Sequence, residues 1–146
     1  MKRYKRILVP VDGSRLSDIA FERALEFARL VEGDVTIINV AQHILPPPGP
    51  GTMQIDMDEK KIAKDVIDKY VERASKSDVK VNSIVKEGNP ADVIVSMSHD
   101  NDLVIMGTRG HNPLATILLG SVAEKVARES CCPVMLIREK KDDCRR

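Results

Sequence analysis

The chain has 146 residues, enough for one domain that buries roughly two-thirds of its unfolded surface. Its 23 basic side chains nearly cancel its 22 acidic ones and it has no tryptophan, which argues against a nucleic-acid partner. No apolar run approaches the roughly 20 residues that cross a membrane, which excludes a membrane-spanning helix. The short apolar stretch after the basic N-terminus and the three cysteines without metal-site spacing predict a cytoplasmic protein with reduced thiols.

The first part of the chain alternates between strand and helix signals. Residues 7–11 form an apolar run typical of a strand covered on both faces, and apolar residues then recur at helical spacing to about residue 31. A second strand is predicted over residues 35–40. The segment 41–56 holds four prolines and two glycines, which predicts a mobile loop near the entrance to a ligand site.

The rest of the chain continues the alternation. A second helix follows the loop, with one apolar face formed by Ile62, Val66, Ile67, Tyr70, Val71 and Ala74. The later elements are, in order, a strand over 79–85, a helix with Asn89 as N-cap and Pro90 in its first turn, a strand over 103–106, a helix over 121–129, a strand over 133–137 and a charged tail over 139–146.

Strands that alternate with helices predict the fold class. We expect a single α/β domain over residues 1–146, with a doubly wound parallel sheet and helices on both faces. Ligands of such folds bind beyond the carboxyl ends of the strands, where the strand order reverses. If strands 7–11 and 103–106 are neighbours there, Asp12 and Gly107 face the same crevice, a relation that the sequence alone leaves open.

Two glycine-containing segments predict a phosphate site. Met106-Gly107-Thr108-Arg109-Gly110 follows a buried strand, and Gly120-Ser121-Val122 opens the next helix. Glycines at such a crossing let the backbone approach an anion, and a helix start offers N–H groups and the positive end of a dipole. We also expect a side chain at Gly120 to force an unfavourable positive φ.

Each of these residues has a second interpretation that the sequence leaves open. Gly107 and Gly110 also suit a tight turn, and Ser121 also suits a helix N-cap. Asp12 suits a helix cap or a bond within the turn at Gly13-Ser14. Arg109 suits either a phosphate partner or an exposed arginine.

Taken together, the motifs resemble those of the universal stress proteins, over about residues 3–138. The nucleotide-binding branch of that family carries the pattern G-x2-G-x9-G-[ST], which is met here by Gly107, Gly110, Gly120 and Ser121. The resemblance also rests on three shorter motifs, which are Val9-Pro10-Val11-Asp12-Gly13-Ser14, Gly88-Asn89-Pro90 and Cys132-Pro133-Val134.

The resemblance implies a five-stranded sheet of order 3-2-1-4-5 with two helices on each face, and ATP as the ligand, bound with Mg or Mn. Val40 would contact adenine through its backbone, and Asp12 would bond the ribose or the base edge. The glycine segments would hold the ribose and phosphates through Gly107, Gly110, Gly120, Ser121 and Val122. The remaining residues expected to bind the nucleotide are Pro10, Val11, Met106 and Arg109.

The resemblance also implies a homodimer through the fifth strand and an unidentified protein partner. We expect a cytoplasmic ATP-binding stress-response protein that acts as a nucleotide-dependent switch or regulatory module. A slow ATPase or phosphotransferase is the alternative, although no P-loop, no G-x-G-x-x-G after the first strand and no general base can be recognised. A dimeric scaffold without nucleotide is a third possibility, which the intact glycines disfavour.

Overall fold

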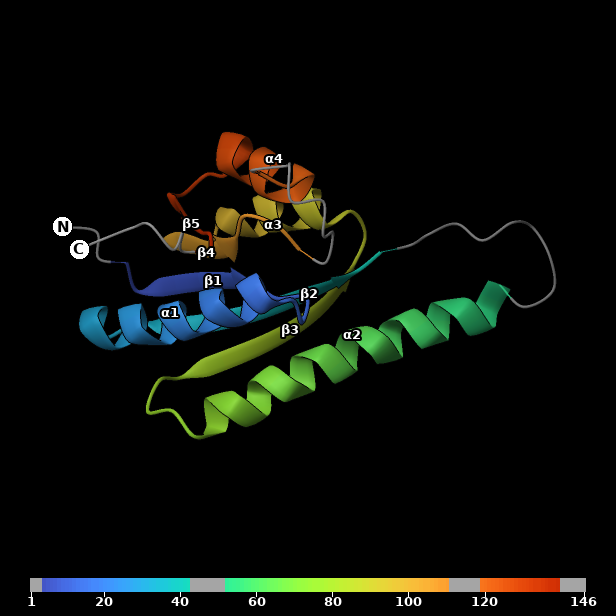
Figure 1. The fold of residues 1–146 in the computed structure, drawn as a ribbon, viewed down its shortest axis with the longest axis horizontal. Coiled ribbons are helices and arrows are strands. Elements are labelled where there is room, and N and C mark those ends of the chain that lie inside the picture. Colours follow the sequence, from blue (N-terminus) through green and yellow to red (C-terminus); the bar gives the residue numbers. More distant parts are fainter. Residues whose placement is uncertain (1–3, 43–51, 111–118, 140–146) are drawn as a thin grey trace.

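Five parallel strands form one sheet in the order β3-β2-β1-β4-β5, as the resemblance implies (Figure 1). The structure, a computed structural model, describes residues 4–42, 52–110 and 119–139, with the backbone alone for residues 52–58. The elements are β1 (Arg6–Pro10), α1 (Arg15–Val31), β2 (Asp34–Ala41), α2 (Thr52–Ser75), β3 (Val81–Glu87), α3 (Pro90–Ser98), β4 (Leu103–Gly107), α4 (Ser121–Glu129) and β5 (Val134–Ile137).

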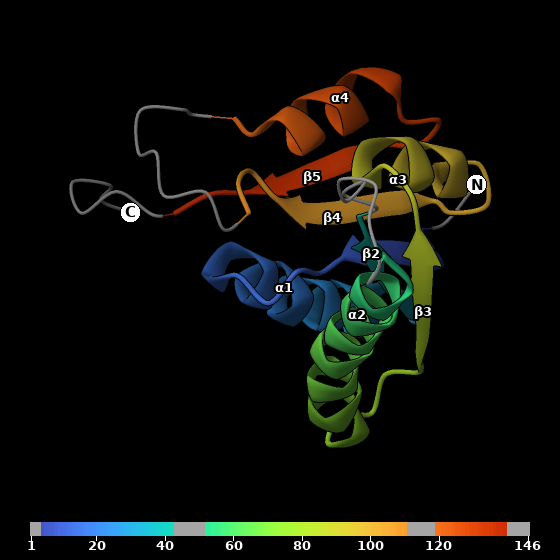
Figure 2. The same ribbon diagram turned by 90° about the vertical axis from the view of Figure 1, so that its right-hand side faces the viewer.

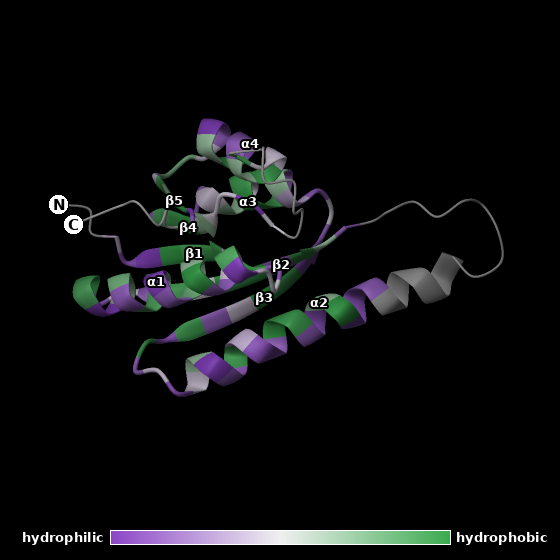
Figure 3. Cartoon of the chain, in the orientation of Figure 1, coloured by the Kyte–Doolittle hydropathy of each residue, from purple (hydrophilic) through white to green (hydrophobic). Residues whose placement is uncertain are grey.

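The helices cover the two faces of the sheet in pairs. Helices α1 and α2 lie on one face and α3 and α4 on the other (Figure 2). Successive strand residues point to opposite faces, so Ile7 and Val9 join the core under α1 and α2 whereas Leu8 joins the core under α3 and α4. Figure 3 shows hydrophobic and hydrophilic residues mixed along α1 and α2, as expected of helices with one buried face.

The strand order places the reversal point between β1 and β4. The chain winds from β1 through β2 to β3 on one side, then crosses to β4 and β5 on the other. Ile7 is paired with Leu103, and Leu8 with Val104, so β1 and β4 are direct neighbours. Asp12, two residues after β1, and Gly107, the last residue of β4, therefore face one crevice.

Helix α3 begins with the cap that the sequence predicts. The Asn89 side chain accepts a hydrogen bond from the Asp92 N–H at 3.1 Å, and Pro90 occupies the first helical position. In α1 the N-cap is Ser14, whose Oγ accepts from the Ser17 N–H at 3.3 Å. This cap starts α1 immediately after the turn that follows β1 and brings Ser17 Oγ within hydrogen-bond distance of the Asp12 N–H.

Several sequence predictions are wrong in detail. Helix α2 already begins at Thr52, so the loop predicted to extend to residue 56 is shorter; residues 43–51, on which the expected entrance loop falls, lie outside the described residues. In α2, Ile62 and Val71 are exposed, because the stripe that packs on the sheet is narrow and runs through Ala63, Ile67, Tyr70 and Ala74.

The predicted strand ends also shift by one or two residues. The first strand covers Arg6–Pro10 and leaves Val11 in the turn, and the third covers Val81–Glu87 rather than residues 79–85. The expected alternation of the third strand is weak, with Val81 and Ile84 only half-buried, because β3 is the edge strand and pairs with β2 alone. Within the described part of the chain, no helix is long and apolar enough to cross a membrane.

Candidate functional site

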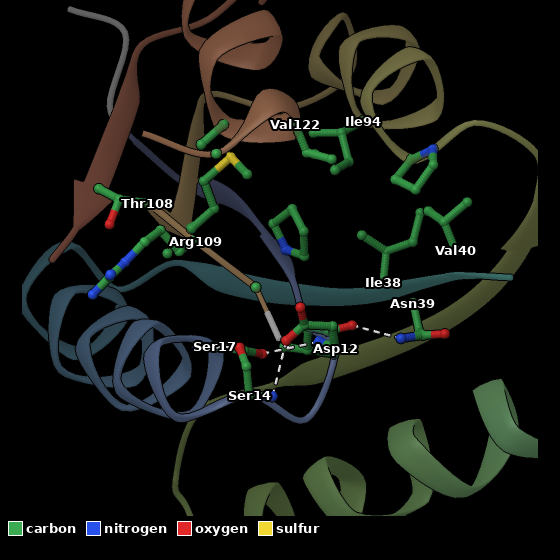
Figure 4. Close-up of a pocket in the computed structure, with 18 of the residues that line it drawn as sticks. Asp12, Ser14, Ser17, Ile38, Asn39, Val40, Ile94, Thr108, Arg109 and Val122 are labelled. Atoms are coloured by element: carbon green, nitrogen blue, oxygen red, sulfur yellow. Dashed lines mark hydrogen bonds between the residues drawn. The ribbon is translucent and has the colours of Figure 1, made fainter. Parts of the chain in front are cut away.

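A cavity of about 520 Å³ lies beyond the carboxyl ends of β1, β2 and β4, at the reversal of strand order (Figure 4). This volume falls within the range of small-molecule sites. Its lining contains every residue that the sequence analysis assigns to the ligand, namely Pro10, Val11, Asp12, Val40, Met106, Gly107, Arg109, Gly110, Gly120, Ser121 and Val122. The tertiary structure thus brings four separate sequence segments to one place, around residues 10–12, 40, 106–110 and 120–122.

Asp12 forms part of a hydrogen-bonded turn on the floor of the cavity. Its Oδ1 accepts from the Ser14 N–H at 2.9 Å, and its own N–H donates to Ser17 Oγ at 3.0 Å. The turn at Gly13, with φ of +81°, allows the chain to enter α1 directly. The bond within the turn that the sequence suggested for Asp12 is therefore present, and the same carboxylate lines the cavity.

A buried amide supports the other flank of the same turn. Asn39, only 9% exposed within β2, donates from Nδ2 to the Val11 carbonyl at 2.7 Å (Figure 4). The Val11 N–H in turn donates to the Ile38 carbonyl at 2.8 Å. Two elements, β2 and α1, thus hold the segment Val11–Asp12 in place.

Gly107, the last residue of β4, and Gly110, in the loop that follows, allow close approaches of different kinds. A Cβ on Gly107 would lie 2.8 Å from the Cβ of Leu16, so the close packing of α1 on β4 requires glycine there. A Cβ on Gly110 would lie 2.5 Å from Asp12 Oδ2, so this glycine lets the loop pass beside the carboxylate. Both positions line the cavity, and both also serve the packing of the protein itself.

The start of α4 differs from the sequence prediction. The N-cap is Gly120, not Ser121, and it makes no side-chain cap bond. Its φ of −67° is ordinary, so the positive φ expected at this position is absent. The Gly120 N–H donates to the Thr108 carbonyl at 2.7 Å, which fastens the helix start to the loop after β4. The first amides of α4, from Ser121 onward, have no intrahelical acceptor and belong to the cavity wall.

Among the described residues that line the cavity, Arg109 is the one with a cationic side chain. Its side chain is 26% exposed, which places it between the two interpretations that the sequence left open. Arg109 Nη2 lies 3.8 Å from Glu139 Oε2, and Glu139 Oε1 lies 3.3 Å from Arg15 Nη1. Glu139, just after β5, thus bridges an arginine of the cavity and one of α1.

The upper part of the cavity in Figure 4 is apolar. Ile38 and Val40 of β2 face Ile94 of α3 and Val122 of α4, whereas Asp12, Ser14 and Ser17 gather on the opposite side. Sequence reasoning assigned none of these further lining residues to the site: Ser17, Ile38, Asn39, Gln42, Pro90, Ile94 and Ala123. Asn39 had a usable signal, a single amide within an apolar strand, but Ile94 looks like any buried helix residue.

Comparison with known proteins shows which family the chain resembles. Residues 3–138 match the universal stress protein family. The chain belongs to this family. Universal stress protein MJ0531 of Methanocaldococcus jannaschii is a relative, 32% identical over 145 residues that cover 96% of this chain and 85% of that one.

Solved structures of the family share the fold. Universal stress protein UspA from Lactobacillus plantarum matches with a TM-score of 0.85 at 24% identity, over 94% of this chain and 100% of that one. A universal stress protein solved in complex with cAMP matches with a TM-score of 0.71 at 24% identity, over 93% and 98% of the two chains. A family member from Arabidopsis thaliana with AMP bound matches at 0.66 and 21% identity, over 95% and 94%.

Proposed function

We propose that this chain binds an adenine nucleotide, ATP in the first place, in the cavity at the β1–β4 reversal. One observation carries the proposal: the glycine segment at the end of β4, the start of α4 and the Asp12 turn all line one cavity. Two relatives of the same fold hold AMP or cAMP, which supports an adenine nucleotide as the ligand class.

The two ends of the cavity differ in the way that a nucleotide requires. Arg109 and the first amides of α4 supply positive charge and N–H donors for the phosphates. The apolar wall formed by Ile38, Val40 and Ile94 suits a flat base, and the Asp12 carboxylate suits a ribose hydroxyl or an exocyclic amine. We therefore assign the phosphates to α4 and the nucleoside to the side of β2.

The donor set suits a divalent cation that arrives with the nucleotide. The lining offers the Asp12 carboxylate and the hydroxyls of Ser14, Thr108 and Ser121, all hard oxygen ligands of the kind that Mg²⁺ or Mn²⁺ accepts. In the described ranges no group of three or more His, Cys, Asp or Glu side chains could hold a metal ion. Such an ion would accordingly be held mainly by the phosphates, near the Ser121 hydroxyl at the start of α4.

The same lining favours a switch over an enzyme. Among the described residues that line the cavity, Asp12 is the one carboxylate, and no histidine, cysteine or lysine is present to act as a general base. The Asp12 carboxylate is already bonded to the Ser14 N–H. We propose a cytoplasmic module that changes its partner interactions with nucleotide occupancy; a slow ATPase or phosphotransferase is the alternative.

A homodimer through β5 forms part of the proposal. This strand ends the sheet and pairs with β4 alone among the described strands, and Met135 is 37% exposed on it. A bare apolar edge invites pairing with a second strand, and a two-fold axis would satisfy both copies at once.

Small molecules released from the purified, denatured protein should be identified by mass spectrometry. We expect an adenine nucleotide among them. Once the nucleotide has been removed and the protein refolded, calorimetry should show that the protein binds ATP. Asp12→Ala should weaken ATP binding and leave inorganic triphosphate binding largely intact, while Asp65→Ala, an exposed position on α2, should change neither. Binding of no adenine nucleotide would refute the proposal, and repeated release of ADP with multiple turnover would replace the switch by the enzyme.

A further inference from the structure

A line of hydrogen bonds runs from the cavity to helix α2. The Asp12 N–H donates to Ser17 Oγ at 3.0 Å, Ser17 Oγ lies 2.9 Å from Tyr70 Oη, and Tyr70 Oη donates to Asp18 Oδ1 at 2.5 Å. Ser17 is 4% exposed and Tyr70 2% exposed. Tyr70 itself does not line the cavity. The line therefore joins a cavity residue to a residue of a different layer of the fold.

The direction of each bond follows from the number of protons available. A hydroxyl carries one proton, and an ionised carboxylate can only accept. Because Tyr70 donates to Asp18, the bond between Ser17 and Tyr70 must use the proton of Ser17. Ser17 Oγ is then an acceptor for the Asp12 N–H, and all donors point away from the cavity toward Asp18.

The far end of the line is firmly held. The Tyr70 ring packs edge-on against Phe21 with 5.2 Å between centroids, and the Arg73 guanidinium lies 5.5 Å from the Tyr70 centroid. Arg73 Nη1 also lies 3.3 Å from Asp18 Oδ1. Burial and the bond to Asp18 raise the pKa of Tyr70 above its ordinary value of 10, so the phenol stays protonated and remains a donor.

We propose that Tyr70 is a positioning residue, which through Ser17 fixes the backbone at Asp12 and so orients the carboxylate toward the nucleoside end of the ligand. This inference rests on the proposed function. The chain from Tyr70 reaches Asp12 and does not reach the start of α4, so its effect belongs to the nucleoside and not to the phosphates. Helix α2 thereby takes part in nucleotide recognition without contacting the nucleotide.

Three variants separate this role from general stability. Tyr70→Phe removes one hydroxyl and keeps the ring, and Tyr4→Phe makes the same change at an exposed tyrosine that precedes β1, at the opposite ends of the strands from the cavity. Ser17→Ala removes the direct acceptor of the Asp12 N–H. The net free energy of one hydrogen bond corresponds to roughly a threefold to tenfold change in affinity. We expect a change of this size in ATP binding from Tyr70→Phe.

Calorimetry with two ligands tests the proposal. We expect Tyr70→Phe to weaken ATP binding by that factor and to leave inorganic triphosphate binding unchanged, whereas Tyr4→Phe changes neither. In an Asp12→Ala background, Tyr70→Phe should have no further effect, because the group that it positions is gone. Equal losses for ATP and triphosphate, or additive losses in the double variant, would overturn the role of Tyr70.

Amide hydrogen exchange provides a readout that needs no nucleotide. Exchange at the Asp12 N–H should accelerate in Ser17→Ala, to a smaller extent in Tyr70→Phe, and not in Tyr4→Phe. A parent chain that binds no adenine nucleotide overturns the proposed function, and with it the role of Tyr70 at the nucleoside end. A parent that binds ATP while Tyr70→Phe alters neither affinity nor Asp12 exchange overturns the role of Tyr70 alone.

Discussion

Gly107, the last residue of β4, lies against Leu16 in the first turn of α1 so closely that a Cβ on the glycine would be 2.8 Å from the Cβ of Leu16. The same Cβ would lie 3.3 Å from the Leu16 carbonyl carbon, so backbone as well as side chain would have to move. Gly107 therefore holds α1 against the sheet, besides lining the cavity.

The first prediction compares Gly107 with Gly110. Gly107→Ala should destabilise the protein by about 1–3 kcal/mol, because the added methyl overpacks the contact with Leu16. Gly110→Ala should have little effect on stability, since its methyl meets only the end of the Asp12 side chain, but it should weaken ATP binding by displacing that carboxylate. Urea unfolding and calorimetry on both variants distinguish the two cases, and equal stability of the two would contradict the packing role.

The second prediction concerns the start of α4. Gly120→Val should weaken ATP binding by at least about tenfold, because each lost backbone bond to a charged oxygen costs roughly 1.5–3 kcal/mol. The cause is bulk, not backbone strain: φ is −67°, but a Cβ would lie 3.1 Å from the Thr108 carbonyl oxygen. Ser121→Ala should cost less, since the neighbouring amides remain. A folded Gly120→Val, checked by circular dichroism, that binds ATP as tightly as the parent would refute the phosphate assignment.

A third prediction follows from the contact of Glu139 with Arg109. Glu139→Gln should strengthen ATP binding by up to about fivefold at low salt, because a carboxylate that competes with the phosphates for Arg109 is neutralised. The gain should shrink as salt is added. Glu26→Gln, which makes the same charge change beside Arg23 on α1, serves as the control. Unchanged or weaker binding in calorimetry would show that Glu139 does not compete with the ligand.

The fourth prediction tests the proposed dimer. Met135→Lys places a charge on the exposed edge of β5 and should shift the protein toward monomer. Leu30→Lys, at a position that is 82% exposed near the end of α1, makes a comparable loss of apolar surface and should leave the assembly unchanged. Light scattering at micromolar concentration measures both, and a monomeric parent would rule the dimer out.

The fifth prediction concerns pH and Asp102, which precedes β4. Asp102 Oδ2 accepts from the N–H groups of Lys5 and Arg6 at 3.1 and 2.9 Å, and Oδ1 lies 3.1 Å from Arg6 Nη2. The hydrogen bond from the Arg6 side chain lowers the pKa of Asp102 from its ordinary 3.8, so the unfolded chain binds more protons than the folded one. Its contribution to stability is therefore present above pH 3.8 and is lost as the pH falls through the folded-state pKa.

Asp102→Asn should accordingly lower the free energy of unfolding by about 1–3 kcal/mol at pH 7. The difference from the parent should shrink as the pH falls below 3.8. Urea unfolding between pH 7 and pH 3 measures this, with Asp65→Asn at an exposed position on α2 as the control. A difference that stays constant over the whole range would mean that the ionised form of Asp102 is not what stabilises the fold.

The sequence by itself determined the fold class and the glycine segments of the site. Apolar runs such as residues 7–11 and helical periodicity are local properties, and so are the Asn89 cap and the spacing of Gly107, Gly110 and Gly120. These features can be read along the chain because neighbours in sequence create them.

The family resemblance already implied that β1 lies beside β4, and the structure confirms it. Only the tertiary structure decided which side chains meet: the contact of Glu139 with Arg109 and the hydrogen bonds from Tyr70 to Asp12 join residues far apart in the chain. A buried tyrosine on an amphipathic helix reads as core, and its hydroxyl gains a role only when packing sets it 2.9 Å from Ser17 Oγ. Periodicity indicates which residues of an element are buried. Which residues they contact depends on the order of the strands in the sheet.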